Sequence, residues 1–269
     1  MSHPRGNRLS YSEVRTMLSC SAKWKFSYFD NLPSPKTVNQ VFGTAIHTAL
    51  ATHFKHHLET GHPPAPGAIQ EVFQKEFEAQ LKTFPAPLLA SLPQAESPLL
   101  LEALGETLLA EYLVNLNPDL IPSRVEGALE GRIGNIPMLG YPDLIARQEG
   151  RPRVIDIKTV GRSPGGISED HRMQLALYGL LYAQSEGLFP LPFLEAELHV
   201  LNKTKAVVEF YRTTLTQADY TYVEEVVPRV ARAIMDGNYY PNRSHLFCSR
   251  KLCPFWAACE SAYGGQVRD

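Results

Sequence analysis

Hydrophobic residues along the first half of the chain recur every three or four positions, which is the spacing of one face of an α-helix. This spacing predicts four helical segments, over residues 9–29, 41–54, 68–83 and 99–116. Ser10 is a candidate cap for the first segment, and Pro33 and Pro35 break the chain after it, because proline cannot continue a helix. We therefore expect a mostly helical first half.

From about residue 124 the pattern changes to short runs of strand-forming residues. Three such runs occupy residues 125–133, 138–147 and 153–160. They are separated by Gly134-Asn135 and Glu149-Gly150, which are turn-forming pairs, so the runs predict an antiparallel meander. The remaining pattern predicts a helix over 169–185, strands over 195–202 and 206–213, and a helix over 217–235.

This order of elements is typical of an α/β sandwich with a central mixed sheet. With 269 residues, 44% hydrophobic and 20% charged, the chain is long enough to bury one sizeable core, and we expect one domain over residues 1–269. No apolar run approaches the roughly 18 residues that span a bilayer, and the first ten residues lack a signal-peptide core. We therefore expect a cytoplasmic protein with no membrane partner.

A candidate catalytic pair lies in residues 154–159, Val-Ile-Asp-Ile-Lys-Thr. Because side chains alternate along a strand, Asp156 and Lys158 project from the same face. An acid and a base at this spacing usually belong to a solvated face, so the pair alone is weak evidence. The flanking Val and Ile residues indicate a buried strand, however, where charges are unfavourable unless they serve a site or a bound ion.

Asp143 lies on the preceding predicted strand, and a hairpin turning near Glu149-Gly150 would set it beside Asp156. Two carboxylates on neighbouring strands suit Mg²⁺ or Mn²⁺, which keep water ligands and also bind phosphate oxygens. Such an ion lowers the pKa of a bound water and stabilises charge in a phosphoryl transition state. Lys158 is a candidate to orient that water or to neutralise the phosphate.

Pro142-Asp143 followed by Asp156-Ile157-Lys158 resembles the signature of the PD-(D/E)XK nuclease superfamily, and specifically its RecB-like branch, which includes CRISPR adaptation nucleases and phage exonucleases. The resemblance implies a restriction-endonuclease-like fold and a Mg²⁺- or Mn²⁺-dependent deoxyribonuclease, most simply an exonuclease acting on DNA ends or single strands. It also implies that Asp143 and Asp156 bind the metal, together with the backbone carbonyl of Ile157, and that Lys158 assists the attacking water.

Further matches lie on either side of this core, in the family's sequence order. Residues 43–47, Gly-Thr-Ala-Ile-His, resemble the branch's Gly-Thr-x-x-His helix, which implies that His47 is a metal ligand. Gln174 and Tyr178 resemble the Gln-x-x-x-Tyr helix that follows the catalytic strand, whose residues help to orient the substrate and the catalytic lysine. The agreement in order over residues 43–178 favours an active nuclease.

Each of these matches has a simpler explanation when it is taken alone. A single histidine on an apolar helix face is more often packed than bound to metal. A Gln and a Tyr four positions apart can hydrogen-bond on a surface without any catalytic role. The family also has an acidic residue ahead of the hairpin; Glu130 and Glu126 both compete for that role, and we favour Glu130.

The four cysteines form a second candidate site, with Cys20 near one terminus and Cys248, Cys253 and Cys259 near the other. In an intracellular protein such clustering indicates a metal rather than disulfides, and four thiolates suit zinc or an iron–sulfur cluster. Zinc sites usually contain two Cys-x-x-Cys pairs. The RecB-like branch has one distant and three C-terminal cysteines around a [4Fe–4S] cluster, so the resemblance implies that cluster, with zinc as the alternative.

One spacing departs from many members of the branch, which have Cys-x-x-Cys before the last gap. Here four residues separate Cys248 from Cys253, so ligation by Cys248 is less well supported. A metal that joined both ends would close a loop of more than two hundred residues. We expect residues 1–36 and 236–269 to form one cysteine-cluster lobe.

Basic and aromatic residues accompany the cysteines, although the net charge of the chain is only −2. They suit either a path for single-stranded nucleic acid or, more simply, packing around metal-bound sulfur. The aromatic residues are Trp24, Phe26, Tyr28, Phe255 and Trp256. The expected partner is DNA that is single-stranded or has a free end. The chain has no Gly-x-x-x-x-Gly-Lys-Ser/Thr motif, so unwinding would need a helicase; a recombinase or single-strand-binding protein is another candidate partner.

Two other functions compete with an active nuclease. The first is a non-catalytic DNA-binding or assembly subunit of a recombination, repair or CRISPR adaptation complex. The complete set of Asp143, Asp156 and Lys158 argues against it, because such a subunit would be free to lose one of them. The second is a zinc-stabilised interaction protein in which the motifs are coincidental.

Overall fold

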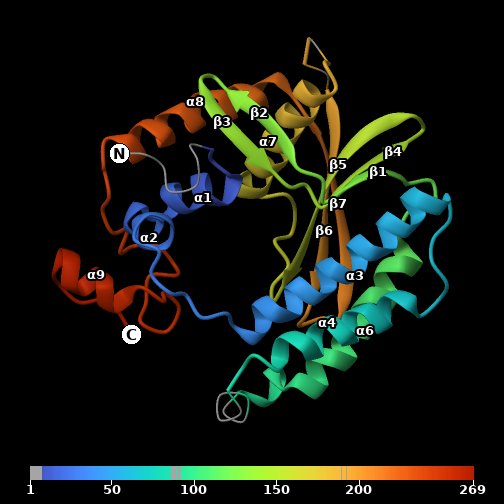
Figure 1. Ribbon diagram of the computed structural model, residues 1–269, viewed down its shortest axis with the longest axis horizontal. Coiled ribbons are helices and arrows are strands. Elements are labelled where there is room, and N and C mark those ends of the chain that lie inside the picture. Colours follow the sequence, from blue (N-terminus) through green and yellow to red (C-terminus); the bar gives the residue numbers. More distant parts are fainter. Residues whose placement is uncertain (1–7, 86–88, 90–91, 189, 192) are drawn as a thin grey trace.

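A mixed five-stranded sheet organises the chain, of which the computed structural model describes residues 8–85, 89, 92–188, 190–191 and 193–269 (Figure 1). Its strands are, in spatial order, β1 (Ile121–Val125), β4 (Leu144–Gln148), β5 (Arg151–Val160), β6 (Leu194–Asn202) and β7 (Val207–Leu215). β5 and β6 are parallel, whereas the other neighbouring pairs are antiparallel. The predicted α/β fold with a central mixed sheet is confirmed.

Both predicted hairpin turns are confirmed, at Gly134-Asn135 between β2 (Leu129–Ile133) and β3 (Ile136–Gly140) and at Glu149-Gly150 between β4 and β5. The runs do not form one meander, because the β2–β3 hairpin is a separate sheet that lies between β1 and β4 in the sequence. Glu126 has a φ of 48° and separates Val125, the last residue of β1, from the rest of the first predicted run, which forms β2. Pro142 interrupts the second run, since it has no N–H to donate to a strand ladder. Asp143 therefore lies in the bend just before β4 and not within a strand.

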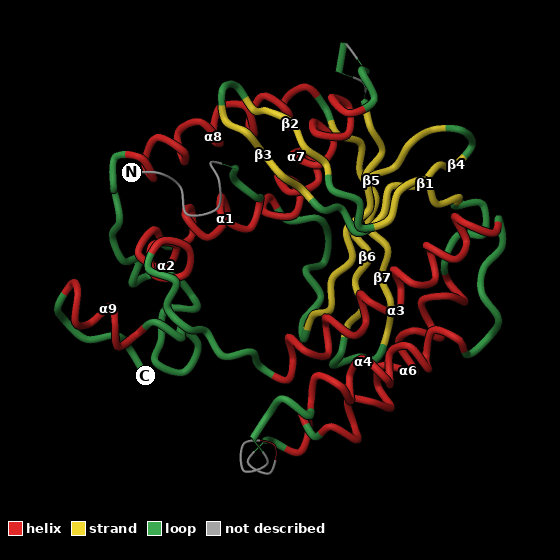
Figure 2. The backbone as a smooth tube through the Cα atoms, viewed as in Figure 1, coloured by secondary structure: helices red, strands yellow, loops and turns green. Residues whose placement is uncertain are grey.

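Helices from the first half of the chain cover one face of the sheet (Figure 2). They are α3 (Val38–Thr60), α4 (Ala68–Leu81) and α6 (Pro98–Asn115), with the 3₁₀ turn η2 (Gln94–Glu96) before α6. Their apolar sides form one buried core with Ile155 and Ile157 of β5. α3 is longer than predicted because Thr37 and Gln40 cap its start reciprocally and Gly61, with a φ of 79°, ends it.

A second buried core lies against the other face of the sheet. The elements that enclose it are α1 (Tyr11–Ser19), α7 (Glu169–Ser185), α8 (Gln217–Met235) and the β2–β3 hairpin. From the sheet, Val154 and Ala196 point into this core. Since Ile155 belongs to the first core, neighbouring residues of β5 serve opposite faces, as the alternation along a strand requires.

The first predicted helical segment, residues 9–29, is wrong as one continuous helix. Cys20 is extended, with φ −163° and ψ 104°, and it separates α1 from α2 (Ser21–Trp24) and the π-helical η1 (Lys25–Phe29). The break is held by long-range contacts, because Ser21 Oγ donates to the carbonyl of Tyr240 (3.0 Å) and accepts from its N–H (2.8 Å). The hydrophobic spacing did not predict α9 (Trp256–Tyr263).

The two ends of the chain meet at this break. Asn242 Nδ2 donates to the carbonyl of Ser19 (3.0 Å), and in Figure 1 α2 and α9 lie in the same part of the molecule.

Within the described ranges, no helix combines the length and the apolar character that crossing a membrane requires.

Candidate active site

The strand register brings two carboxylates together at the centre of the sheet. Leu144 pairs with Ile155, so Asp143, one residue earlier, lies beside Asp156 on the neighbouring strand. Asp156 is only 2% exposed, and Lys158 Nζ lies 2.7 Å from each of its carboxylate oxygens. Oδ1 accepts a hydrogen bond from Lys158, whereas Oδ2 is buried and has no donor of suitable geometry in the described part of the chain.

Asp143 connects this strand pair to α3. Its Oδ2 accepts a hydrogen bond from the backbone N–H of Ile157 (2.6 Å), and its Oδ1 lies 3.0 Å from Nδ1 of His47. The bend before β4 thus directs the carboxylate both to the catalytic strand and to the helix. The structure brings His47, Asp143, Asp156 and Lys158 into one contiguous group.

The two carboxyl groups differ in their tendency to ionise. Burial raises the pKa of Asp156 to about 6, because the opposing effect of Lys158 is too small to offset burial and the nearby charge of Asp143. Burial also acts on Asp143, but the hydrogen bond and charge of His47, with Lys158, hold the pKa of Asp143 below its ordinary value. Asp143 is therefore the more readily ionised of the pair.

The two basic groups remain positively charged more readily than usual. Burial alone would lower the pKa of His47, but its hydrogen bond to Asp143 reverses this effect and raises that pKa. Burial likewise acts against a charged Lys158, and the carboxylates of Asp156 and Asp143 outweigh it, so the pKa of Lys158 is raised. Each acid thus has a basic partner within the group.

Gln174 and Tyr178 lie on α7, on the side of the sheet to which Asp156 projects. Gln174 Nε2 donates to the hydroxyl of Tyr178 (3.1 Å), and both side chains are buried. Burial, together with the negative charge of Asp156, raises the pKa of Tyr178, so its hydroxyl stays protonated. A Cβ at Gly140 would lie only 3.0 Å from the Tyr178 ring, which explains the glycine at that position.

The structure does not bring either candidate acidic residue upstream of the hairpin into this group. Glu130 is 58% exposed on β2, and its carboxylate accepts a hydrogen bond from Arg8 (2.6 Å). Glu126 binds Lys55 at the surface through its side chain (2.7 Å), and only its backbone N–H reaches Asp143, at the carbonyl (3.2 Å).

Sequence reasoning missed a cluster from α1 and α7 that adjoins Lys158. Tyr11 donates a hydrogen bond to the carboxylate of Asp170 (2.6 Å), and Arg15 forms an ion pair with the same carboxylate (2.7 Å). Burial and the charges of Lys158 and Arg15 lower the pKa of His171. These contacts join residues about 150 positions apart, so no local spacing in the sequence could have indicated them.

The donor chemistry of the first group fits a hard divalent cation. Two carboxylates, an imidazole and the carbonyl of Ile157 are the ligand types that Mg²⁺ and Mn²⁺ accept, and Oδ2 of Asp156 is in ion-pair contact with Lys158 but accepts no hydrogen bond within the described residues. Among the described residues, however, no three His, Cys, Asp or Glu side chains form a ready metal-binding group. Asp156 would have to turn away from Lys158 to take part.

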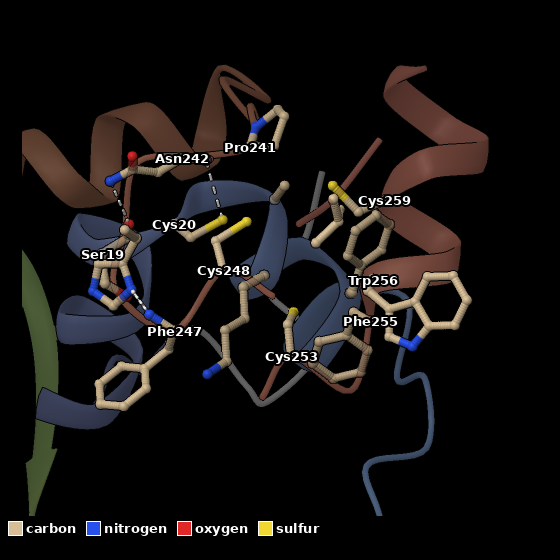
Figure 3. A pocket seen from close by; sticks show the side chains of 15 residues that line it. Ser19, Cys20, Pro241, Asn242, Phe247, Cys248, Cys253, Phe255, Trp256 and Cys259 are labelled. Carbon is tan, nitrogen blue, oxygen red and sulfur yellow. Dashed lines mark hydrogen bonds between the residues drawn. The ribbon is translucent and has the colours of Figure 1, made fainter. Parts of the chain in front are cut away.

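The four cysteines, from opposite ends of the chain, line one pocket (Figure 3). All four are free thiols, and Cys20 Sγ accepts a hydrogen bond from the backbone N–H of Asn242 (3.4 Å). Burial raises the pKa of Cys253 and of Cys259. Thiols are the donors that a thiophilic metal or cluster takes, but among the described residues no three of these sulfurs lie together as a ready metal-binding group.

The aromatic residues near the cysteines serve mainly as packing. Trp24, Phe26 and Phe255 are at most 4% exposed, so they offer no stacking surface to a nucleic acid. Phe26 and Phe255 contact each other, with ring centres 6.0 Å apart. Trp256 is partly exposed and stacks against the guanidinium of Arg250, 5.0 Å from the ring centre.

Comparisons with known proteins agree with this geometry. Residues 8–260 match the family model of the PD-(D/E)XK nuclease superfamily. The fold is similar to a crystal structure from Eubacterium rectale named as a candidate exonuclease, with a TM-score of 0.56 and 12% identity over 89% of this chain and 85% of that one. A structure of SSO0001 covers 93% of this chain and 95% of its own at 17% identity, but its TM-score of 0.39 is too low to support a conclusion. No curated protein sequence matches.

Proposed function

Since the chain belongs to the PD-(D/E)XK nuclease superfamily, we propose that it is a Mg²⁺- or Mn²⁺-dependent DNA exonuclease of the RecB-like branch. It hydrolyses phosphodiester bonds at DNA ends or in single strands. The observation that carries the proposal is the group formed by His47, Asp143, Asp156 and Lys158, in which buried carboxylates on neighbouring segments meet a lysine and a histidine. The E. rectale structure named as a candidate exonuclease supports the preference for DNA ends.

Asp143, Asp156, His47 and the carbonyl of Ile157 would hold the metal, which when bound supplies a Lewis acid and an activated water. Asp143 is already oriented, because Ile157 N–H and His47 hold its two oxygens. Lys158 keeps its proton, so its ammonium group can bind a phosphate oxygen or orient the attacking water. Tyr178 also keeps its proton, and with Gln174 it limits the positions that Asp156 and Lys158 can adopt.

The cysteine pocket belongs to the same proposal. We expect Cys20, Cys248, Cys253 and Cys259 to hold a [4Fe–4S] cluster, with zinc as the alternative; the support is that they line one pocket although they come from both ends of the chain. Purification without oxygen, followed by visible absorbance and analysis for iron, sulfide and zinc, separates these two. A colourless, zinc-loaded protein would refute the cluster and leave the nuclease proposal intact.

The test of the nuclease is cleavage of end-labelled single- and double-stranded DNA with Mg²⁺ or Mn²⁺. Asp156→Asn and Lys158→Ala should each reduce kcat by at least about 100-fold, because the first removes a proposed metal ligand and the second removes the ammonium group proposed to bind the phosphate or the attacking water. Asp119→Asn, a change at an exposed residue in the connection to β1, is the matched control and should cleave as the wild type does.

Two results would overturn the assignment. One is the absence of cleavage by the wild type under all these conditions, which would favour a non-catalytic DNA-binding or assembly subunit. The other is unchanged cleavage by Asp156→Asn and Lys158→Ala. If the enzyme is active only after a helicase, recombinase or single-strand-binding protein is added, the same variants must still abolish the stimulated activity.

A further inference from the structure

A groove runs along the start of α3 and ends at the candidate metal site. Its lining residues are Lys36, Gln40, Gly43, Thr44 and His47, and its volume is about 470 Å³. Gln40, Gly43, Thr44 and His47 recur at helical spacing and form one stripe on α3, and Lys36 lies in the segment that leads into the helix. His47 is the last of them, and its Nδ1 lies 3.0 Å from Asp143.

The groove is held close to the end of the catalytic strand. At Gly43 an added Cβ would lie 2.9 Å from Oγ1 of Thr159, the residue that follows Lys158 on β5. Any larger residue at 43 would therefore require the Thr159 side chain or α3 to shift. On the far side of α3, Lys203 at the end of β6 hydrogen-bonds Asn39, which ties the start of the helix to the sheet.

The length of the stripe suits a polymer better than a small molecule. From Gln40 to His47 the helix advances roughly 10 Å, at about 1.5 Å per residue, and Lys36 lies beyond the N-terminal end of the helix. Phosphates of one DNA strand follow each other at about 3.4 Å along a duplex axis. The stripe can therefore face several successive phosphates, with His47 at the end where cleavage is proposed.

Hydrogen-bond donors and one free cation give the groove its chemistry. Gln40 uses its side-chain oxygen to cap Thr37, which leaves its amide N–H₂ group available as a donor. Asp143 and Asp156 are already paired with His47 and Lys158. Lys36 is exposed, and no residue in the described ranges forms an ion pair or hydrogen bond with its ammonium group.

We propose that Lys36 binds a backbone phosphate of the DNA strand that is cleaved, so that this strand lies along α3 and its scissile phosphate reaches His47, Asp143 and Asp156. Lys36 is then a positioning residue that acts several nucleotides away from the reacting bond. The inference rests on the proposed nuclease function and adds to it the surface along which the substrate lies.

Equilibrium binding tests this contact separately from the chemistry. Fluorescence anisotropy of a labelled single-stranded oligonucleotide, measured in EDTA, reports affinity while no metal supports cleavage. Lys36→Ala should weaken binding and reduce the slope of log affinity against log salt by about 0.7, the value for one phosphate contact on a single strand. Lys36→Glu should weaken it further, and Lys36→Arg should retain it.

Lys75→Ala is the matched control, because Lys75 is an exposed lysine on α4 away from the groove, and it should leave affinity and slope unchanged. In cleavage assays Lys36→Ala should raise KM and leave kcat nearly unchanged, which is the signature of lost ground-state binding. Unchanged affinity and salt slope in Lys36→Glu would overturn the inference even if the wild type cleaves DNA. A wild type that binds DNA through Lys36 without cleaving it would instead overturn the proposed function.

Discussion

The active-site group and the cysteine pocket are assembled in opposite ways. The register of β4 and β5 brings Asp143 beside Asp156. The backbone N–H of Ile157 and the side chains of His47 and Lys158 contact these carboxylates, so charge is balanced within the protein. Around Cys20, segments from the two ends of the chain meet, and the thiols have raised pKa values at Cys253 and Cys259 because of burial. The first region forms without a metal, whereas in the second the proposed metal would add a cross-link to the hydrogen bonds and apolar packing that already join the two ends.

The largest expected effect of this difference is on stability at the cysteine pocket. Cys259→Ser should lower the free energy of unfolding of the metal-loaded protein by several kcal/mol, because metal binding is coupled to the folding of the segments that supply the ligands. Thermal unfolding with visible absorbance measures both the loss of stability and the loss of the metal. Ser261→Ala, on the exposed side of the same helix, should change neither.

An unchanged melting temperature in Cys259→Ser, with metal still bound, would show that the pocket needs no such cross-link. The two regions would then be alike, since both would be held by ordinary packing. Phe26 and Phe255 would be the residues responsible, because they form the small apolar cluster that contacts Cys259.

The same contrast explains how much the sequence could predict. Asp156 and Lys158 were recognisable because a two-residue spacing on an apolar strand is a local signal, and the mixed sheet followed from the order of elements. The break in the helix at Cys20 could not be recognised from the sequence, because it depends on a contact between Ser21 and Tyr240, which are 219 positions apart. The link between Asp143 and His47 likewise depends on tertiary packing, and only the family resemblance indicated it.

The next largest effect should be a gain in stability at the active site. In metal-free protein at pH 7, Asp156→Asn should raise the free energy of unfolding by about 1 to 3 kcal/mol, because burial raises the pKa of Asp156 even with Lys158 beside it, so the charged carboxylate is disfavoured and the amide carries no charge. The folded-state pKa of about 6 lies above the ordinary value of 3.8. Between these values the folded state binds more protons than the unfolded state, so the stability of the wild type falls as pH rises through this window.

Urea unfolding in EDTA at a series of pH values measures this difference. The advantage of Asp156→Asn should be complete above about pH 6 and should disappear as pH falls towards 4, since the wild-type carboxyl is then protonated in the folded protein. Asp119→Asn, at an exposed position, should follow the wild type at every pH. A variant that is less stable than the wild type at pH 7 would mean that the ion pair with Lys158 outweighs burial.

The smallest effect concerns a buried hydrogen-bonded chain next to the active site. His199 of β6 pairs in register with Ile157, and its Nε2 lies 3.0 Å from the carboxylate of Glu197 while its Nδ1 lies 2.7 Å from the hydroxyl of Tyr112. Burial disfavours an ionised Tyr112, whose pKa is raised, so this hydroxyl donates to Nδ1 and the imidazole donates from Nε2 to Glu197.

Tyr112→Phe should lower the free energy of unfolding by about 1 kcal/mol, because Nδ1 of buried His199 then lacks a donor while the ring packing is kept. Burial lowers the pKa of His199, so below about pH 6.5 the unfolded state takes up a proton that the folded state does not. The free energy of unfolding should therefore decrease as the pH is lowered, in the wild type and in Tyr112→Phe alike. Tyr222→Phe, at an exposed position of α8, is the control. If the proposed cluster is bound, its visible absorbance should be the same in all three proteins, because the hydrogen bonds from Tyr112 through His199 to Glu197 support the sheet alone. A loss of that absorbance in Tyr112→Phe would instead mean that the two regions are coupled.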